Sequence, residues 1–177
     1  MSASKELFGG AITVTLPSEL IDASNFRQVP DTQEVFVSPN SGLSVIVEVL
    51  QSVAATDPRE AAGFHFDALA HDNDAKSKTI TDTATVSNGS VGGTPDPVVL
   101  EGTQMVEKFN RTKPDEVRIL LALFRVPDKT VDLVMTMNVP MTSGDGGALT
   151  EADYRSVKDV FDTAAKSLRI VDYGLFA

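Results

Sequence analysis

Residues 117–126 read VRILLALFRV, and this stretch decides the fold class of the chain. Both its odd and its even positions are apolar over the middle of the stretch, and successive side chains of a strand point to opposite faces of a sheet. A strand that is apolar on both faces is covered on both sides. A tight turn follows at residues 127–129, and residues 131–139 then alternate apolar residues with polar ones such as Asp132, which is typical of a half-buried strand. We therefore expect a hairpin at the centre of a sheet that has layers packed on both faces.

Two helices and further strands flank this hairpin. The first helix is expected to begin after Asp57, because Pro58 suits the first helical position and Glu60 the third. The second begins after Thr150 and carries apolar residues at helical spacing. Further strands are predicted at residues 11–16, 34–38, 43–51, 79–86 and 98–109. Because the strands cluster in hairpins, we predict the α+β class: a largely antiparallel, twisted β-sheet sandwiched between helices in one domain, residues 1–177.

Composition and charge exclude several classes of protein. The chain has 177 residues, 42% of them hydrophobic, and it contains no cysteine, so a thiol nucleophile and a cysteine-bound zinc are ruled out. With 15 basic and 25 acidic residues the net charge is −10, which disfavours nucleic acid and anionic lipid and favours basic partners. The first ten residues lack the apolar segment of a secretory signal, and no apolar run approaches the length of a membrane helix. We expect a soluble, intracellular monomer.

The remaining motifs carry little chemistry. His65 lies on an apolar helical stripe and is interpreted as a core histidine, with a small enzyme built around it as the alternative. Residues 71–74 lack the spacing of a calcium loop, and we expect no metal and no cofactor. The glycine-rich stretches at residues 88–97 and 143–147 lack the lysine and hydroxyl residue of a phosphate loop, so they are interpreted as flexible loops.

One segment, residues 22–36, gathers carboxylates around a proline. Asp22 precedes the bend at Pro30 in the sequence. The bend is followed by Asp31, Gln33 and Glu34, at the start of a predicted strand. Such a cluster can form an acidic binding patch. The same residues also suit a solvated turn with a capping aspartate, and the pattern leaves both interpretations open.

This segment resembles the Mog family of Ran guanine-nucleotide release factors. The specific part is Val29-Pro30-Asp31-Thr32-Gln33-Glu34-Val35-Phe36. Supporting stretches are residues 7–11 (LFGGA), Ile21-Asp22, Arg27-Gln28, residues 44–50, 61–67 and 71–75, and the strand pair around 119–124 and 132–138. The resemblance covers nearly the whole chain.

The resemblance implies an antiparallel sheet between helices, a fold also seen in the photosystem PsbP proteins. It implies binding to the small GTPase Ran, release of its nucleotide without covalent chemistry, a role in nuclear protein import, and presence in nucleus and cytoplasm. It leaves open a ternary complex with another Ran-binding protein. The partner-binding residues that it implies are Asp22, Asp31 and Glu34, with Arg27, Gln33 and Phe36 matching the motif.

A protein that binds nucleotide-free Ran more tightly weakens nucleotide binding by the same factor. Asp31 and Glu34 are expected to supply the attraction, while Phe36 either anchors the contact or supports the turn from beneath. Reversing the charge of Glu34 should then cost about 2–5 kcal/mol of binding. The alternative is an adaptor of the same fold that binds Ran or another basic partner without releasing nucleotide.

Overall fold

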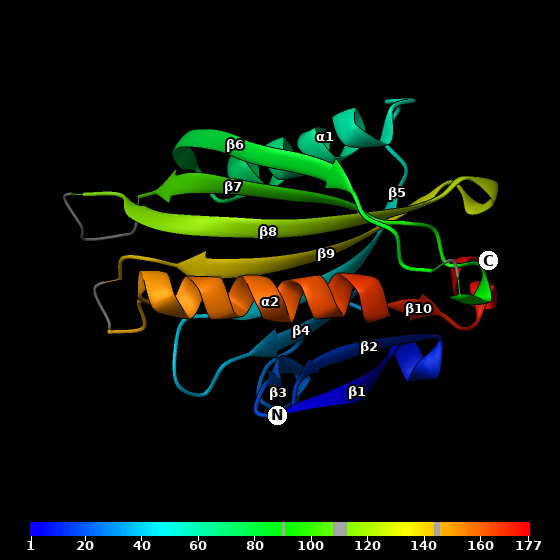
Figure 1. Cartoon of the computed structure of the whole chain (residues 1–177), viewed down its shortest axis with the longest axis horizontal. Coiled ribbons are helices and arrows are strands. Elements are labelled where there is room, and N and C mark those ends of the chain that lie inside the picture. Colours follow the sequence, from blue (N-terminus) through cyan, green and yellow to red (C-terminus); the bar gives the residue numbers. More distant parts are fainter. Residues whose placement is uncertain (90, 108–112, 144–145) are drawn as a thin grey trace.

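The computed structural model of the chain describes residues 1–89, 91–107, 113–143 and 146–177. The described strands form two antiparallel sheets, and two α-helices pack against them (Figure 1). The strands are β1 (Ser2–Leu7), β2 (Ile12–Pro17), β3 (Ile21–Asp22), β4 (Gln33–Val37), β5 (Ser44–Gln51), β6 (Ala75–Thr85), β7 (Val98–Val106), β8 (Asp115–Val126), β9 (Val131–Pro140) and β10 (Arg169–Ile170). The α-helices are α1 (Pro58–Asp72) and α2 (Glu151–Ser167), and short 3-10 turns include η1 (Phe8–Gly10), η2 (Ala23–Asn25) and η5 (Tyr173–Phe176).

The central hairpin explains the layering. The larger sheet has the order β3-β4-β5-β9-β8-β7-β6, so β8 and β9 lie in its interior. Even positions of β8, such as Leu120 and Phe124, belong to a large core that also contains side chains of α2 and of the smaller sheet. Odd positions, such as Ile119 and Leu121, belong to a second core with Phe66 of α1. The double apolar pattern therefore reflects two separate cores, one on each face.

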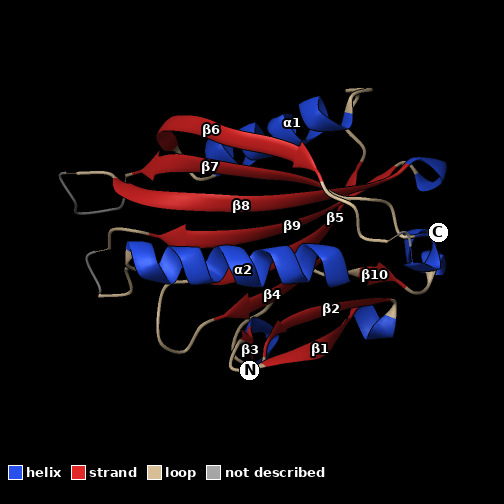
Figure 2. Ribbon diagram, in the orientation of Figure 1, coloured by secondary structure: helices blue, strands red, loops and turns tan. Residues whose placement is uncertain are grey.

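The helices take opposite faces of the larger sheet. Helix α1 packs on β6, β7 and β8, and α2 packs on β2, β8 and β9; Figure 2 shows α2 in front of the strands and α1 behind them. The Asp57 side chain caps α1 by accepting from the Arg59 N–H, as its sequence predicts. Thr150 and Asp153 form a reciprocal capping box at the start of α2. No helix among the described residues is both long and apolar enough to cross a membrane.

The strands differ from the sequence-based expectations in several respects. Strand β9 is buried on both faces rather than half-buried, and Asp132 is completely inaccessible to solvent. The polar segment Ser2–Leu7 is a strand, although it was not predicted as one. It pairs with β2, and β2 pairs with β10, so the chain forms a second, three-stranded sheet rather than a single sheet. The strand predicted to reach Phe109 ends at Val106, and residues 108–112 lie outside the described part of the chain.

The glycine-rich stretch 88–97 was expected to be a flexible loop, but hydrogen bonds hold its described residues in place. The structure describes all of this stretch except residue 90. The buried Asn88 amide donates to the carbonyls of Thr94 (3.3 Å) and Pro95 (2.9 Å). The Thr94 hydroxyl accepts from the Ile170 N–H at 3.0 Å, so the loop is fastened to β10. The second glycine-rich stretch, 143–147, includes residues 144–145, which lie outside the described residues.

Two glycines make a matched test of core packing. A Cβ at Gly102 of β7 would lie 2.7 Å from the Phe66 ring and 2.7 Å from the Thr79 carbonyl oxygen, whereas one at Gly63 of α1 would meet nothing closer than Ile80, at 3.9 Å. Gly102→Ala should therefore destabilise the protein by about 1–3 kcal/mol through overpacking. Gly63→Ala should be neutral or stabilising by up to about 1 kcal/mol, because alanine favours helix. Urea unfolding of both variants measures this, and equal stabilities would contradict the packing of Phe66 against β7.

Candidate functional site

The segment before β4 is a backbone-anchored turn. Asp22 Oδ1 accepts from the Ser24 N–H (2.9 Å) and hydroxyl (2.7 Å), and so caps η2. The N–H groups of Phe26 and Arg27 both donate to the carbonyl of buried Ala23, at 3.2 and 3.0 Å. The chain then bends so that the Gln33 N–H donates to the Pro30 carbonyl at 3.0 Å. These hydrogen bonds therefore hold the backbone of the acidic segment, which leads into β4, in a defined conformation.

The strand register divides the predicted site residues between two faces of the sheet. Asp22 pairs with Phe36, and directly paired residues share a face, so Asp22, Glu34 and Phe36 lie on one face and Gln33 on the other. The Glu34 carboxylate accepts from the Phe8 N–H at 2.7 Å and joins the larger sheet to η1. Phe36 is only 4% exposed and packs in the larger core. Of the two roles considered for Phe36, the structure therefore supports the one beneath the surface.

Glu48 of β5 joins this set, although the sequence did not single it out. It pairs with Gln33 across the strands, and the Gln33 amide donates to its carboxylate at 2.7 Å. Both side chains are half-buried, while Asp31 and Arg27, which precede Gln33 in the sequence, are exposed. Glu48 is the one charged residue in the Val- and Ile-rich strand β5, and that isolated charge is the signal that could have found it.

The Gln33–Glu48 pair lies beside the area that α1 covers. Glu48 and Leu50 share a face of β5 with the odd positions of β8, against which α1 packs. The main packing of α1 is on β6, β7 and β8, and its His65 reaches β9 by a hydrogen bond to Asp132. Strands β4 and β5 lie between β9 and the β3 edge of the larger sheet. Gln33 and Glu48 therefore lie towards that edge, beyond the strands that α1 covers.

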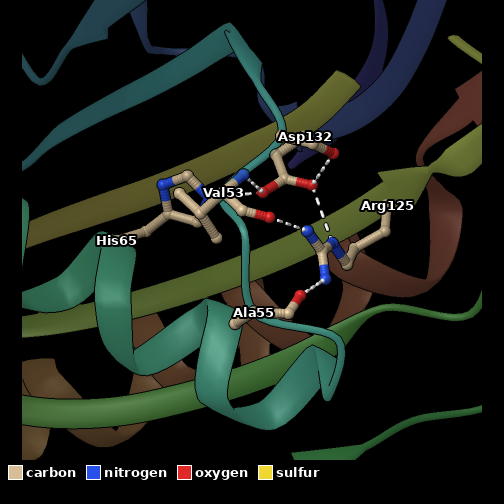
Figure 3. A network of polar contacts seen from close by, with 6 residues as sticks. Val53, Ala55, His65, Arg125 and Asp132 are labelled. Atoms are coloured by element: carbon tan, nitrogen blue, oxygen red, sulfur yellow. Dashed lines mark hydrogen bonds and ion pairs between the residues drawn. The ribbon is translucent and has the colours of Figure 1, made fainter. Parts of the chain in front are cut away.

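A second polar cluster is buried between α1 and the sheet (Figure 3). Asp132 Oδ2 contacts His65 Nε2 at 2.7 Å and accepts from the Val53 N–H at 3.2 Å. Its Oδ1 accepts from Arg125 Nε at 2.9 Å and from the Ser52 hydroxyl at 3.0 Å. Burial raises the pKa of Asp132, but the hydrogen bonds from His65, Arg125, Val53 and Ser52 outweigh it and hold that pKa below its usual value.

The geometry of this cluster suits support rather than nucleophilic chemistry. The Ser52 hydroxyl donates to Asp132 and not to the His65 imidazole, so the imidazole is not placed to take a proton from it. Arg125 also donates to the carbonyls of Val53 and Ala55, which fixes the connection between β5 and α1 (Figure 3). His65 lies in the core, as predicted. The described residues contain no group of three or more potential ligands that could hold a metal ion.

The sequence of this chain is similar to one protein family over nearly its whole length. Residues 5–140 match the sequence model of the family described as Ran-interacting Mog1 protein. The Ran guanine nucleotide release factor of Danio rerio is 34% identical, over 98% of this chain and 99% of its own length. The human protein of the same name is 35% identical, over 76% of this chain and 74% of its own length.

Solved structures agree with the sequence comparison. The crystal structure of the Saccharomyces cerevisiae Ran-binding protein Mog1p matches all of this chain and 99% of its own, at 29% identity and a TM-score of 0.82. The predicted α+β class and the family resemblance are confirmed. The chain belongs to the Ran-interacting Mog1 protein family.

Proposed function

We propose that this protein binds the small GTPase Ran, promotes release of its guanine nucleotide and supports nuclear protein import. Relatives that match nearly the whole chain carry the names Ran guanine nucleotide release factor and nuclear import protein MOG1. The observation that carries the proposal is an acidic surface on a turn and two strands beyond α1. This surface, called the β4–β5 surface below, comprises Arg27, Asp31, Gln33 and Glu48, while Asp22, Glu34 and Phe36 lie on the other face of the sheet and support it.

The charge of the β4–β5 surface suits a GTPase. Two carboxylates, those of Asp31 and Glu48, outnumber the one guanidinium of Arg27. A GTPase holds its nucleotide through Mg²⁺ and a lysine on the phosphates. Carboxylates that engage basic groups beside the nucleotide, or that disfavour Mg²⁺ binding, would stabilise the nucleotide-free form. The Gln33–Glu48 hydrogen bond holds one carboxylate in place before the partner arrives, which lowers the entropy cost of binding.

Release then follows from linkage alone. If the protein binds nucleotide-free Ran more tightly than loaded Ran by some factor, it weakens nucleotide binding by the same factor. No covalent step is needed, so we propose a regulator without catalysis of bond breaking. The protein is proposed to act as a monomeric single domain in nucleus and cytoplasm, and a ternary complex with another Ran-binding protein fits the same scheme.

The test is the rate at which Ran loses a fluorescent guanine nucleotide in excess unlabelled nucleotide. We expect release to accelerate with added protein and to reach a plateau as Ran saturates. Binding to Ran without faster release would favour the adaptor alternative. Absence of binding to GTP-loaded, GDP-loaded and nucleotide-free Ran would contradict the proposed function altogether.

A further inference from the structure

Phe26 is a large apolar side chain that folding leaves in water. It is 62% exposed and directly precedes Arg27 of the β4–β5 surface. Ile21, in the same segment, is 39% exposed. The exposed large apolar residues among those described are Met1, Ile21, Phe26, Phe64, Ile80 and Val171. Two of the six therefore fall within six consecutive residues, next to the carboxylates proposed to bind Ran.

The backbone presents Phe26 in a fixed place. Its N–H donates to the Ala23 carbonyl, and the next N–H, that of Arg27, donates to the same oxygen. Ala23 is fully buried, and the Asp22 side chain caps the turn from the other end. An aromatic ring on such an anchored turn loses little backbone freedom when a partner covers it.

The surroundings of Phe26 have the composition of an interface centre. Interfaces concentrate their binding energy in a few aromatic or arginine side chains, and a polar rim keeps water away from them. In the sequence, Phe26 stands between the capping Asp22 and the charged residues Arg27 and Asp31. The carboxylates can orient a partner that has basic groups, and an apolar centre that keeps water out strengthens such charge pairs.

We propose that Phe26 is the apolar anchor of the Ran interface, and this proposal rests on the proposed function. The ring would enter a shallow apolar depression of Ran whose border carries basic side chains for Asp31 and Glu48. The carboxylates would thus set the orientation and the rate of association, and Phe26 would set how long the complex lasts.

Phe64 provides a matched control, because it is 58% exposed and lies on α1 rather than in the acidic segment. Phe26→Ala should weaken binding to nucleotide-free Ran by about 10- to 100-fold, mainly through faster dissociation. Phe64→Ala should change the affinity by less than about twofold, since isolated surface apolar residues contribute little. Phe26→Leu keeps an apolar group and should recover most of the lost affinity. Surface plasmon resonance gives both rates, and thermal unfolding checks that each variant is folded.

The outcomes separate this proposal from the one on which it rests. A Phe26→Ala variant that binds Ran within twofold of the unsubstituted protein, while charge reversal of Asp31 abolishes binding, would overturn the anchor and leave the proposed function intact. Equal losses for Phe26→Ala and Phe64→Ala would also overturn it. If the unsubstituted protein fails to bind Ran, both proposals are wrong.

Discussion

Replacing Asp132 by alanine should lower the free energy of unfolding by about 3–5 kcal/mol, because it leaves the half-buried Arg125 guanidinium and the buried His65 imidazole without their carboxylate. Asp132 is fully buried, and it accepts from Arg125, from the Val53 N–H and from the Ser52 hydroxyl, and contacts His65. Urea unfolding followed by circular dichroism measures the loss. A loss below about 1 kcal/mol would contradict the assigned network.

The control for Asp132 is the same substitution at Asp162 of α2. Asp162 forms an exposed ion pair with Lys166 at 3.0 Å, and exposed pairs of this kind contribute about 0.3–0.5 kcal/mol. The effect of pH gives a second check. Since the pKa of Asp132 is lowered on folding, its stabilisation is complete above its unfolded pKa of about 3.9 and is lost as the pH falls through the folded pKa. The stability gap between the unsubstituted protein and Asp132→Ala should therefore be wider at pH 7 than at pH 3.

Reversing the charge of Asp31 or of Glu48 should weaken Ran binding by about 2–5 kcal/mol if each meets a basic group in the complex. Asp31 is exposed and Glu48 is half-buried beside Gln33, so neither change removes a core contact. Asp159→Lys on α2 is the control: it changes the net charge by the same amount on the opposite face of the larger sheet. Isothermal titration calorimetry with nucleotide-free Ran gives the affinities. Equal losses at all three positions would indicate a general field effect and contradict a local interface.

Glu34 requires a different substitution. The sequence alone suggested Glu34→Lys, but the carboxylate accepts from the Phe8 N–H, so lysine would disturb the join between the two sheets as well as any binding. Glu34→Gln keeps an oxygen that can accept this bond and removes only the charge. It is the variant that separates the structural part of Glu34 from a part in binding.

The two-core fold could be predicted because its signal is local. Residues 117–126 are apolar at both odd and even positions, which by itself indicates that other elements pack on both faces of the strand. The cap residues Asp57 and Thr150 mark the starts of the two helices. Strand β1 carried no such signal, because SASKEL is mostly polar and its pairing partner β2 decides its conformation. Tertiary pairing overrides local propensity in such segments.

The site could be predicted only in part, because its geometry depends on register. Glu48 and Gln33 are fifteen residues apart, and only the β4–β5 pairing brings them together. Asp132 looked solvent-facing from alternation alone. Its partner side chains, Arg125 and His65, come from β8 and α1, and no local pattern reveals that these charges meet in the core.

The most direct test of the β4–β5 surface compares nucleotide release from Ran with the unsubstituted protein and with a double variant that carries both Asp31→Lys and Glu48→Lys. We expect that the unsubstituted protein accelerates release, that the folded double variant does not, and that the Asp159→Lys control behaves like the unsubstituted protein. A double variant that is folded and still accelerates release at the unsubstituted rate would contradict the claim that the β4–β5 surface acts on Ran.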